Sequence, residues 1–422
     1  MASHTWLVAG LRTPFARVDG PLRRLDAVAL SVPVAQAMAA QLAAGDRPDL
    51  MVWGTVMPSL GVSNIAREVV LDAKLDPSTP AFSTVLACAT SMAAVLEASG
   101  MLGGGVDVAL CGGVESMSRV QLGLTQGLSD WIRRLTQART VGERIDRAAE
   151  LRWRDVRLHV PSVTNRATGK SMGEHCEEMA KQWSVARADQ DRIALLSHQR
   201  AVQAMTNGFF DDLIVPVEGT TRDGLPRADT SAAKLATLKP AFDRTSGKGT
   251  ITAGNASALT DGAAAVWVAS DAGLARLPAS RPRARLVDFE LAAVDIFHEG
   301  LLMAPAYAIP RLLRRNDLSL EAIDLWEIHE AFAAQVLCNV AALESEAFVR
   351  EQAKVDAAPG RFPWDRFNPN GGSVAIGHPF GATGARILSL AVKELAAMGP
   401  GKRAVVSICA DGGLGAVALL QS

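Results

Sequence analysis

The sequence predicts an α/β fold of two similar halves with a mainly helical segment inserted in it, and three observations support this fold class. Short apolar runs alternate with Ala-rich helical stretches near the N-terminus. The same alternation returns near the C-terminus, and a more polar segment separates the two. The length of 422 residues also fits two or three domains better than a single core.

The N-terminal stretch shows the alternation most clearly. The runs DLMVWGTVM (49–57) and VDVALCGGV (106–114) are typical of buried strands. SMAAVLEASGMLGG (91–104) is typical of a helix lined with small residues. Strands that alternate with helices in this way predict an α/β domain.

The C-terminal stretch repeats this order of elements. AIDLWEIHEAF (322–332) resembles RPDLMVWGTVM (47–57), because each has an acid, an apolar strand and a turn. GTITAGNASALTDGAAAVWVAS (249–270) and KRAVVSICADGGLGAVALLQS (402–422) each predict two apolar strands joined by a small-residue loop with an Asp-Gly. The matches predict an internal duplication.

The alternation of strands and helices at both ends, with the polar segment between them, predicts three units. Residues 1–118 and 240–270 form the N-terminal half, residues 119–239 form an inserted loop domain, and residues 271–422 form the C-terminal half.

The inserted domain contains a basic amphipathic stretch at 121–160, where eight Arg and five Asp or Glu leave a net charge of +3. Leu128, Trp131, Ile132 and Leu135 have the spacing of one helix face. Two interpretations remain open. The stretch is a cap packed on the protein's own core with a solvated Arg face, or it is a docking surface for a membrane or a partner subunit.

Composition excludes several classes of function. The net charge of −1 gives no global sign of binding to nucleic acid. The first apolar run is too short for a signal peptide, and no run of about 18 apolar residues could span a membrane, so we expect a cytoplasmic protein. The odd cysteine count, without a C-x-x-C pair, argues against disulfides and zinc. The five cysteines are Cys88, Cys111, Cys176, Cys338 and Cys409.

Cys88 lies in STVLACATSMAAVLEAS, where a strand leads into a thiol and a helix starts directly after it. The positive end of the helix dipole would then face the sulfur and favour its thiolate. A buried structural cysteine is the alternative.

His378 lies in NPNGGSVAIGHPFGATGARILSL (368–390), the most specific stretch of the chain. Glycines allow the backbone to approach a ligand closely, and proline fixes the turn. A rigid polar loop of this kind favours a catalytic histidine, and histidine suits the removal of a thiol proton at neutral pH.

Two further sites carry reactive side chains. His329 and Glu330 open a helix in IHEAFAAQ (328–335), where they form either a capping pair or a group that orients a water or a carbonyl oxygen. Residue 333 is Ala, so the pair lacks the spacing of a zinc protease, and we expect no metal. Cys409 precedes a glycine-rich turn whose N–H groups are free to face a ligand.

Together these motifs resemble the thiolase family, in the same order and over nearly the whole chain. The motifs are RTPFAR, CATSMAA, GGVESMS, MGEHCEEMAKQW, AGNASALTDGAAA, HEAFAAQ, GGSVAIGHPFGATGAR and CADGGLG. The resemblance implies a thiolase-like fold of two βαβαβαββ halves in a layered αβαβα core. The histidine of HEAFA, where many thiolases have Asn, is similar to the degradative group that includes the β subunit of trifunctional β-oxidation enzymes.

The resemblance also implies roles for the site residues. Cys88 would accept the acyl group, His378 would take its proton, and Cys409 would exchange a proton with the acetyl-CoA carbon. The Cys88 and Asp411 N–H groups would form one oxyanion hole. His378 and a water near His329 would form the other.

Compared with the thiolase pattern, this sequence has two departures. The resemblance also implies one contact with CoA. Asp411 stands where thiolases usually have Gly or Ala, so we expect its side chain to point away from the oxyanion. Ala258 replaces a common Gly or Pro, which we expect to be mild. Ser257 would contact CoA.

We therefore expect a 3-ketoacyl-CoA thiolase that uses CoA and acyl-CoA as substrates and needs no cofactor. The alternatives are a biosynthetic acetyl-CoA acetyltransferase, a β-ketoacyl synthase and a catalytically inactive CoA-binding subunit. The second cysteine argues against the synthase, and the intact Cys88, His378 and Cys409 argue against the inactive subunit. By family habit we expect a homodimer or a dimer of dimers, with a hydratase/dehydrogenase α subunit and peripheral membrane contact through 121–160 as further partners, and no nucleic acid.

Overall fold

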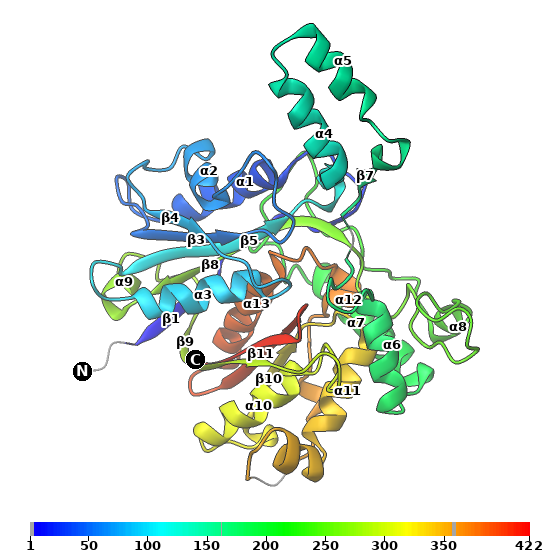
Figure 1. The fold of residues 1–422 in the computed structure, drawn as a ribbon. Helices are drawn as coiled ribbons and strands as arrows, with labels where there is room; N and C mark the ends of the chain where they lie inside the picture. Colours follow the sequence, from blue (N-terminus) through cyan, green and yellow to red (C-terminus); the bar gives the residue numbers. More distant parts are fainter. Residues whose placement is uncertain (1–3, 162, 357–359) are drawn as a thin grey trace.

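The computed structural model describes residues 4–161, 163–356 and 360–422 (Figure 1). Its strands are β1 (Thr5–Val8), β2 (Ala16–Arg17), β3 (Leu50–Gly54), β4 (Ala81–Ser83), β5 (Val108–Glu115), β6 (Gly123–Leu124), β7 (Leu158–His159), β8 (Thr260–Ala269), β9 (Arg283–Ala293), β10 (Leu325–Ile328), β11 (Arg403–Ala410) and β12 (Leu414–Gln421). Its α-helices are α1 (Ala27–Ala39), α2 (Ile65–Asp72), α3 (Thr90–Met101), α4 (Gln126–Gln137), α5 (Val141–Ala149), α6 (Met172–Gln182), α7 (Arg187–Thr206), α8 (Ala232–Ala236), α9 (Asp271–Leu274), α10 (Ala304–Arg315), α11 (Ala333–Leu343), α12 (Ser373–Ile376) and α13 (Thr383–Met398).

The strands pair in the order β10-β11-β12-β9-β1-β8-β5-β3-β4, and the two ends of this sheet repeat one another. In one half β3 and β5 are parallel, while β5, β8 and β1 are antiparallel neighbours. In the other half β10 and β11 are parallel, while β11, β12 and β9 are antiparallel neighbours. The antiparallel pair β1–β9 joins the halves, so the topology has the internal symmetry that the repeated sequence texture predicts.

Helices cover the sheet in layers (Figure 1). α3 and α13 pack against each other between the two halves of the sheet, where α3 contacts β5 and β8 of the first half and α13 contacts β10 and β11 of the second. α1 and α2 cover the outer face of the first half, and α10 and α11 cover the outer face of the second. The architecture is a layered α/β fold of two similar halves, as the sequence predicts.

The central layer follows from the sequence. The buried side of α3 consists largely of small and apolar residues, so the helix can lie close to its neighbours. β5 and β8 are buried along their whole length, which explains why both are continuous apolar runs rather than alternating ones.

One predicted strand is not formed. We expected two strands in 249–270, but only β8 forms there, and Asp261 and Gly262 lie within it rather than in a loop. The preceding residues form a loop because Glu177 takes their N–H groups: its carboxylate accepts from the backbone of Thr250 at 2.8 Å and of Ile251 at 2.9 Å. The second member of this match, 402–422, does form two strands, β11 and β12.

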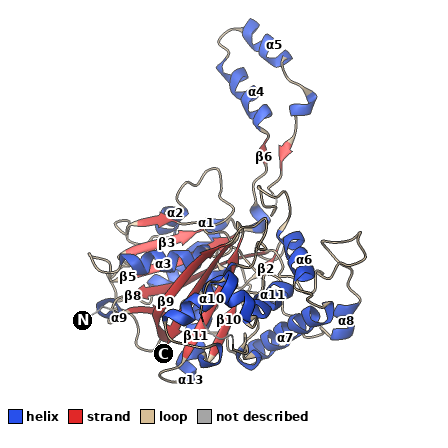
Figure 2. Cartoon of the chain, turned by 60° about the horizontal axis from the view of Figure 1, so that its bottom comes forward, coloured by secondary structure: helices blue, strands red, loops and turns tan. Residues whose placement is uncertain are grey.

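The basic amphipathic stretch is not a cap on the core. α4 and α5 form a hairpin that extends away from the body of the protein, and it is joined to the body by the short β6–β7 ribbon (Figure 2). Neither helix has a buried residue. The interpretation as a cap is therefore wrong, because the apolar faces of α4 and α5 pack on each other and not on the sheet. None of the helices in the described ranges is long and apolar enough to cross a membrane.

Candidate active site

Cys88 lies between β4 and α3, at the N-terminal end of the helix. The residue before it, Ala87, has a φ of 44°, a left-handed conformation that is rare for a residue with a side chain. The Thr90 hydroxyl holds this turn, since it donates to the Ala87 carbonyl at 2.7 Å and accepts from the Leu86 N–H at 2.9 Å. Backbone strain at a thiol that is turned toward a cavity is typical of a functional position.

Most of the predicted site residues meet at one cavity of about 470 Å³. Cys88, Ser257, His378, Cys409 and Asp411 all line it. The rest of its wall is mainly apolar, formed by side chains that include Val163, Met172, Phe242, Leu259, Leu302, Phe332 and Phe380. A small number of reactive groups in an apolar cleft is the usual form of a small-molecule site.

The surroundings of Cys88 act on the pKa of its thiol in opposite directions. Burial and the nearby Asp411 carboxylate raise the pKa of Cys88 to about 12, although N–H groups of Asp411 and of Cys88 itself act in the opposite direction. The thiol is therefore protonated at neutral pH, and Cys88 needs a base to become a nucleophile.

His378 lies in the loop between α12 and α13, and only its side-chain Nε2 is free to act. The turn depends on Gly377, whose φ of 103° suits glycine. The His378 Nδ1 lies 2.7 Å from the Thr383 hydroxyl, while its Nε2 is buried and has no hydrogen-bond partner in the described part of the chain. Burial and the charge of Arg386 lower the pKa of His378 to about 3, so the ring is neutral and able to accept a proton.

His329 follows β10 and lies behind His378, with the two ring centroids 4.1 Å apart. It does not itself line the cavity. Its Nδ1 is 2.8 Å from the Ser373 hydroxyl, and its buried Nε2 has no partner among the described residues. The two unpaired Nε2 atoms make this the place where a polar group of a ligand or a water would be bound.

Glu330 anchors the segment that carries His329 and does not reach the cavity. Its carboxylate accepts hydrogen bonds from Ser197 at 2.7 Å, from Asn368 at 2.7 Å and from the Val374 N–H at 3.1 Å. These contacts tie together three chain segments that surround the histidines, so Glu330 has a positioning role.

Cys409 lies near the end of β11 and is only 1% exposed. Burial, with a smaller contribution from Cys88, raises the pKa of its thiol well above the ordinary value. Cys409 is therefore a protonated thiol that faces the same cavity as Cys88, which suits it to donate a proton.

The backbone N–H of Asp411 acts on Cys88, whereas its carboxylate is hydrogen-bonded to other groups. This N–H lowers the pKa of the Cys88 thiol, against the effects of burial and of the Asp411 carboxylate. Its Oδ1 accepts from the Asn165 side-chain amide at 2.8 Å and from the Gly412 N–H at 2.6 Å. The side chain is thus turned toward the inserted segment, yet its charge still acts on the Cys88 thiol.

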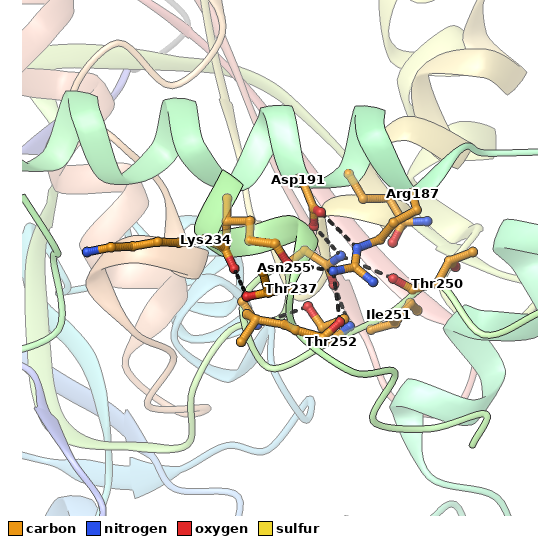
Figure 3. Close-up of polar contacts among 12 residues, drawn as sticks. Arg187, Asp191, Lys234, Thr237, Thr250, Ile251, Thr252 and Asn255 are labelled. Carbon is orange, nitrogen blue, oxygen red and sulfur yellow. Dashed lines mark hydrogen bonds and ion pairs between the residues drawn. The ribbon is translucent and has the colours of Figure 1, made fainter. Parts of the chain in front are cut away.

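Ser257 lies at the end of a loop that α7 supports. Figure 3 shows the Asp191 carboxylate between two donors, Arg187 at 2.8 Å and the side-chain amide of Asn255 at 3.0 Å. The Ser257 hydroxyl donates to the Ala331 carbonyl at 2.9 Å, so the loop also contacts the segment after β10. These bonds hold the cavity wall that Ser257 forms.

Glu115 was not predicted from the sequence, and its buried carboxylate lies under the site. It accepts from Thr55 Oγ1 at 2.9 Å, from the Val56 and Met57 N–H groups at 3.1 and 3.0 Å, and from the Gly381 N–H at 3.1 Å. It thereby joins a cavity-wall segment to the His378 loop. An acid that follows an apolar strand in VALCGGVE is the signal that could have identified it.

Within the described ranges, no cluster of His, Cys, Asp and Glu side chains could hold a metal ion. The chemistry of the site therefore has to be considered from its thiols, its imidazoles and its backbone N–H groups.

Comparisons with known proteins identify the family of the chain. The model of the thiolase N-terminal domain matches residues 5–272, and that of the thiolase C-terminal domain matches residues 280–422. The chain is 37% identical over 423 aligned residues to proteins named 3-ketoacyl-CoA thiolase from Yersinia enterocolitica and Yersinia pestis, which covers 98% of this chain and 96% of each relative.

Solved structures give the same result. The human mitochondrial 3-ketoacyl-CoA thiolase has a TM-score of 0.80 and 28% identity. The Bacillus anthracis acetyl-CoA acetyltransferase has a TM-score of 0.79 and 31% identity. Each comparison covers 100% of this chain and 99% of the other.

Proposed function

The chain belongs to the thiolase family and is an acyltransferase, and we propose that it cleaves 3-oxoacyl-CoA with CoA to give acetyl-CoA and a shortened acyl-CoA in fatty-acid β-oxidation. The observation that carries this proposal is the pair of thiols, Cys88 and Cys409, on one apolar cavity beside the neutral His378. Acyl transfer through a thioester needs a nucleophile, a base and a separate proton donor.

In the first half-reaction the proton of Cys88 moves to His378 Nε2, and the thiolate attacks the 3-oxo carbon. The bond between carbons 2 and 3 breaks, which leaves the acyl group on Cys88. The electron pair stays on the acetyl-CoA carbon, and this carbanion takes the proton of Cys409. Acetyl-CoA then leaves.

In the second half-reaction the thiol of CoA gives its proton to the Cys409 thiolate and attacks the acyl-Cys88 carbonyl. Acyl-CoA leaves, and the Cys88 thiolate regains its proton from His378. All protons return to their starting positions, so the cycle needs no cofactor beyond its two CoA substrates.

Two oxyanions form in this cycle. The N–H groups of Cys88 and Asp411 would donate to the acyl-Cys88 carbonyl, and this role is supported by the effect of both N–H groups in lowering the pKa of the Cys88 thiol. The Nε2 atoms of His378 and His329 suit the other oxygen, through a water in the case of His329. Ser257 is on the wall past which CoA would enter.

The wall of the cavity favours degradation over the synthesis of acetoacetyl-CoA. Aromatic and aliphatic side chains surround the thiols, and they offer an alkyl chain more apolar surface than an acetyl group can use. The solved acetyl-CoA acetyltransferase has the same fold, so the fold itself does not distinguish the two reactions.

The test is the CoA-dependent loss of 3-oxoacyl-CoA, with a four-carbon and a sixteen-carbon substrate compared at equal concentration. We expect turnover by the wild-type enzyme with preference for the long chain, and none by Cys88→Ala. Preference for the four-carbon substrate would favour the biosynthetic role. No turnover by the wild type together with activity in Asp411→Gly would mean that Asp411 disables the site.

We also propose that the α4–α5 hairpin binds an anionic membrane surface. The stretch 121–160 has a net charge of +3, and Val141, Ile145 and Trp153 are 75, 64 and 90% exposed. Basic and apolar side chains on one projecting element suit a lipid interface. Cosedimentation with anionic and with neutral vesicles, for the full chain and for a variant without 121–160, tests this contact.

Loss of vesicle binding in the deletion variant would support the membrane contact, and unchanged binding would contradict it. Retention of a hydratase/dehydrogenase subunit only by the intact hairpin would assign the surface to that partner instead.

We propose a homodimer or a dimer of dimers as the assembly, which light scattering measures directly. The free state of all five cysteines suits the reducing cytoplasm, where we place the protein.

A further inference from the structure

His329 is a buried imidazole whose proton can be on either nitrogen, and its surroundings decide which. The ring is fully buried, and burial together with His378 and Arg386 holds its pKa well below the ordinary value. The imidazole is therefore neutral, with one N–H donor and one acceptor nitrogen. Whether His329 can donate toward the site depends on which nitrogen carries the proton.

The Ser373 hydroxyl and the Arg386 guanidinium determine which nitrogen of His329 carries the proton. Arg386 Nη2 donates to Ser373 Oγ at 3.0 Å, and a guanidinium cannot accept a hydrogen bond. The proton of Ser373 must go elsewhere, and its one other hydrogen-bond contact in the described ranges is His329 Nδ1, at 2.8 Å. Ser373 therefore donates to Nδ1, which leaves the imidazole proton on Nε2.

His378 is in the opposite state, for a parallel reason. The Thr383 hydroxyl donates its proton to the Pro379 carbonyl at 3.0 Å. It must then accept the hydrogen bond from His378 Nδ1, at 2.7 Å. The proton of His378 is on Nδ1, and its Nε2 presents a lone pair.

The buried charge of Arg386 is favoured by nearby acidic groups. Arg386 is 4% exposed, and Glu327 and Glu330 are the acidic groups that act on its charge most closely. Its Nε and Nη1 have no hydrogen-bond partner in the described part of the chain, so the contact with Ser373 is its one such bond to a side chain. The guanidinium of Arg386 therefore fixes the orientation of the Ser373 hydroxyl through this hydrogen bond.

We propose that Arg386 and Ser373 are positioning residues that hold His329 as the Nε2–H tautomer, so that it donates to a water that faces the site while the adjacent His378 accepts a proton. This inference rests on the proposed thiolase reaction for its consequence, but not for the tautomer itself. Two histidines whose ring centroids are 4.1 Å apart thus act as a donor and an acceptor.

The first test is the ¹⁵N NMR spectrum of histidine-labelled enzyme, because protonated and unprotonated ring nitrogens have distinct shifts. His329→Asn identifies the signals of His329. We expect a protonated Nε2 in the wild type, and in Ser373→Ala a loss of this single state. A protonated Nδ1 in the wild type would overturn the inference. The spectrum needs no turnover, so it decides the tautomer even if the proposed reaction fails.

The second test is kinetic. We expect Ser373→Ala to lower kcat at least about tenfold with a smaller change in KM, because the donor acts on charge that forms in the transition state. Ser389→Ala, which removes another buried hydroxyl of the same region, is the matched control and should retain kcat. Equal kcat for Ser373→Ala and the wild type, with Nε2 still protonated in the variant, would overturn the role of Ser373.

Discussion

The active-site cavity and the α4–α5 hairpin are opposite kinds of region within one chain. Around the cavity, single buried carboxylates such as Glu115 and Glu330 accept hydrogen bonds from segments far apart in the sequence. In the hairpin the contacts are local, such as the bond of 2.7 Å from the Trp131 indole to the Arg147 carbonyl. The hairpin has no buried residue in either helix.

This difference shows how the molecule separates chemistry from contact with its surroundings. A site that depends on remote segments is sensitive to any change that moves one of them. A projecting hairpin can change without moving the thiols, so it is free to serve as a binding surface. Four substitutions test this separation.

Removal of the nucleophile should have the largest effect. Cys88→Ala should lower kcat by about 10⁴-fold or more, because no acyl-enzyme can form. The measurement is CoA-dependent cleavage under saturating substrate. Cys111→Ala removes a buried thiol outside the cavity and is the control. Substantial turnover by Cys88→Ala would show that the acyl group is carried elsewhere.

Loss of the carboxylate under the site should weaken the fold as well as the reaction. Glu115→Gln replaces an acceptor of four hydrogen bonds with an amide whose NH₂ faces donors, and we expect a loss of about 1–3 kcal/mol in the free energy of unfolding. Urea denaturation measures it. Glu97→Gln, at an exposed acid with one side-chain bond to Thr84, should cost clearly less. Equal losses in the two variants would remove the special role of Glu115.

Removal of the charge at Asp411 should make Cys88 more reactive. The Asp411 carboxylate raises the pKa of the thiol, so Asp411→Asn should lower that pKa and increase the thiolate fraction at a given pH. We expect iodoacetamide to alkylate Cys88 about three- to tenfold faster near pH 8, with the pH profile moved to lower pH. Asp211→Asn, at an exposed acid elsewhere, is the control. An unchanged profile would contradict an effect of the Asp411 charge.

A substitution in the hairpin should have the smallest effect. Ile145→Ala should change the free energy of unfolding by less than about 0.5 kcal/mol and leave kcat unchanged, because Ile145 is 64% exposed. Ile309→Ala makes the same replacement at a side chain that is 1% exposed, and it should cost about 2–5 kcal/mol. A large loss from Ile145→Ala would mean that the hairpin packs on another surface in solution.

Much of the fold could be predicted from local patterns. The runs around β3, β5, β11 and α3 identified those elements because an element that is buried along most of its length is apolar along most of its length. The strand expected near residue 250 was wrong because a carboxylate of α6 binds the backbone N–H groups that a neighbouring strand would need. No local pattern carries that information.

Within the site, the sequence identified the residue types that chemistry requires. Cys88, His378 and Cys409 stand out as reactive side chains on glycine-rich or helix-initiating segments. Ser373 and Arg386 were not identified, although both lie in the same stretch as His378, because their effect depends on which atom each contacts.

The sequence by itself determined the alternation of strands and helices in the two halves, the duplication and the identity of the reactive groups, since these follow from residue type and spacing. The tertiary structure alone decided the protonation of Cys88, the state of the two histidines and the projection of the hairpin. A pKa depends on burial and on charges brought near through space, and helix packing depends on which apolar surface is within reach. Both depend on contacts between residues remote in the chain.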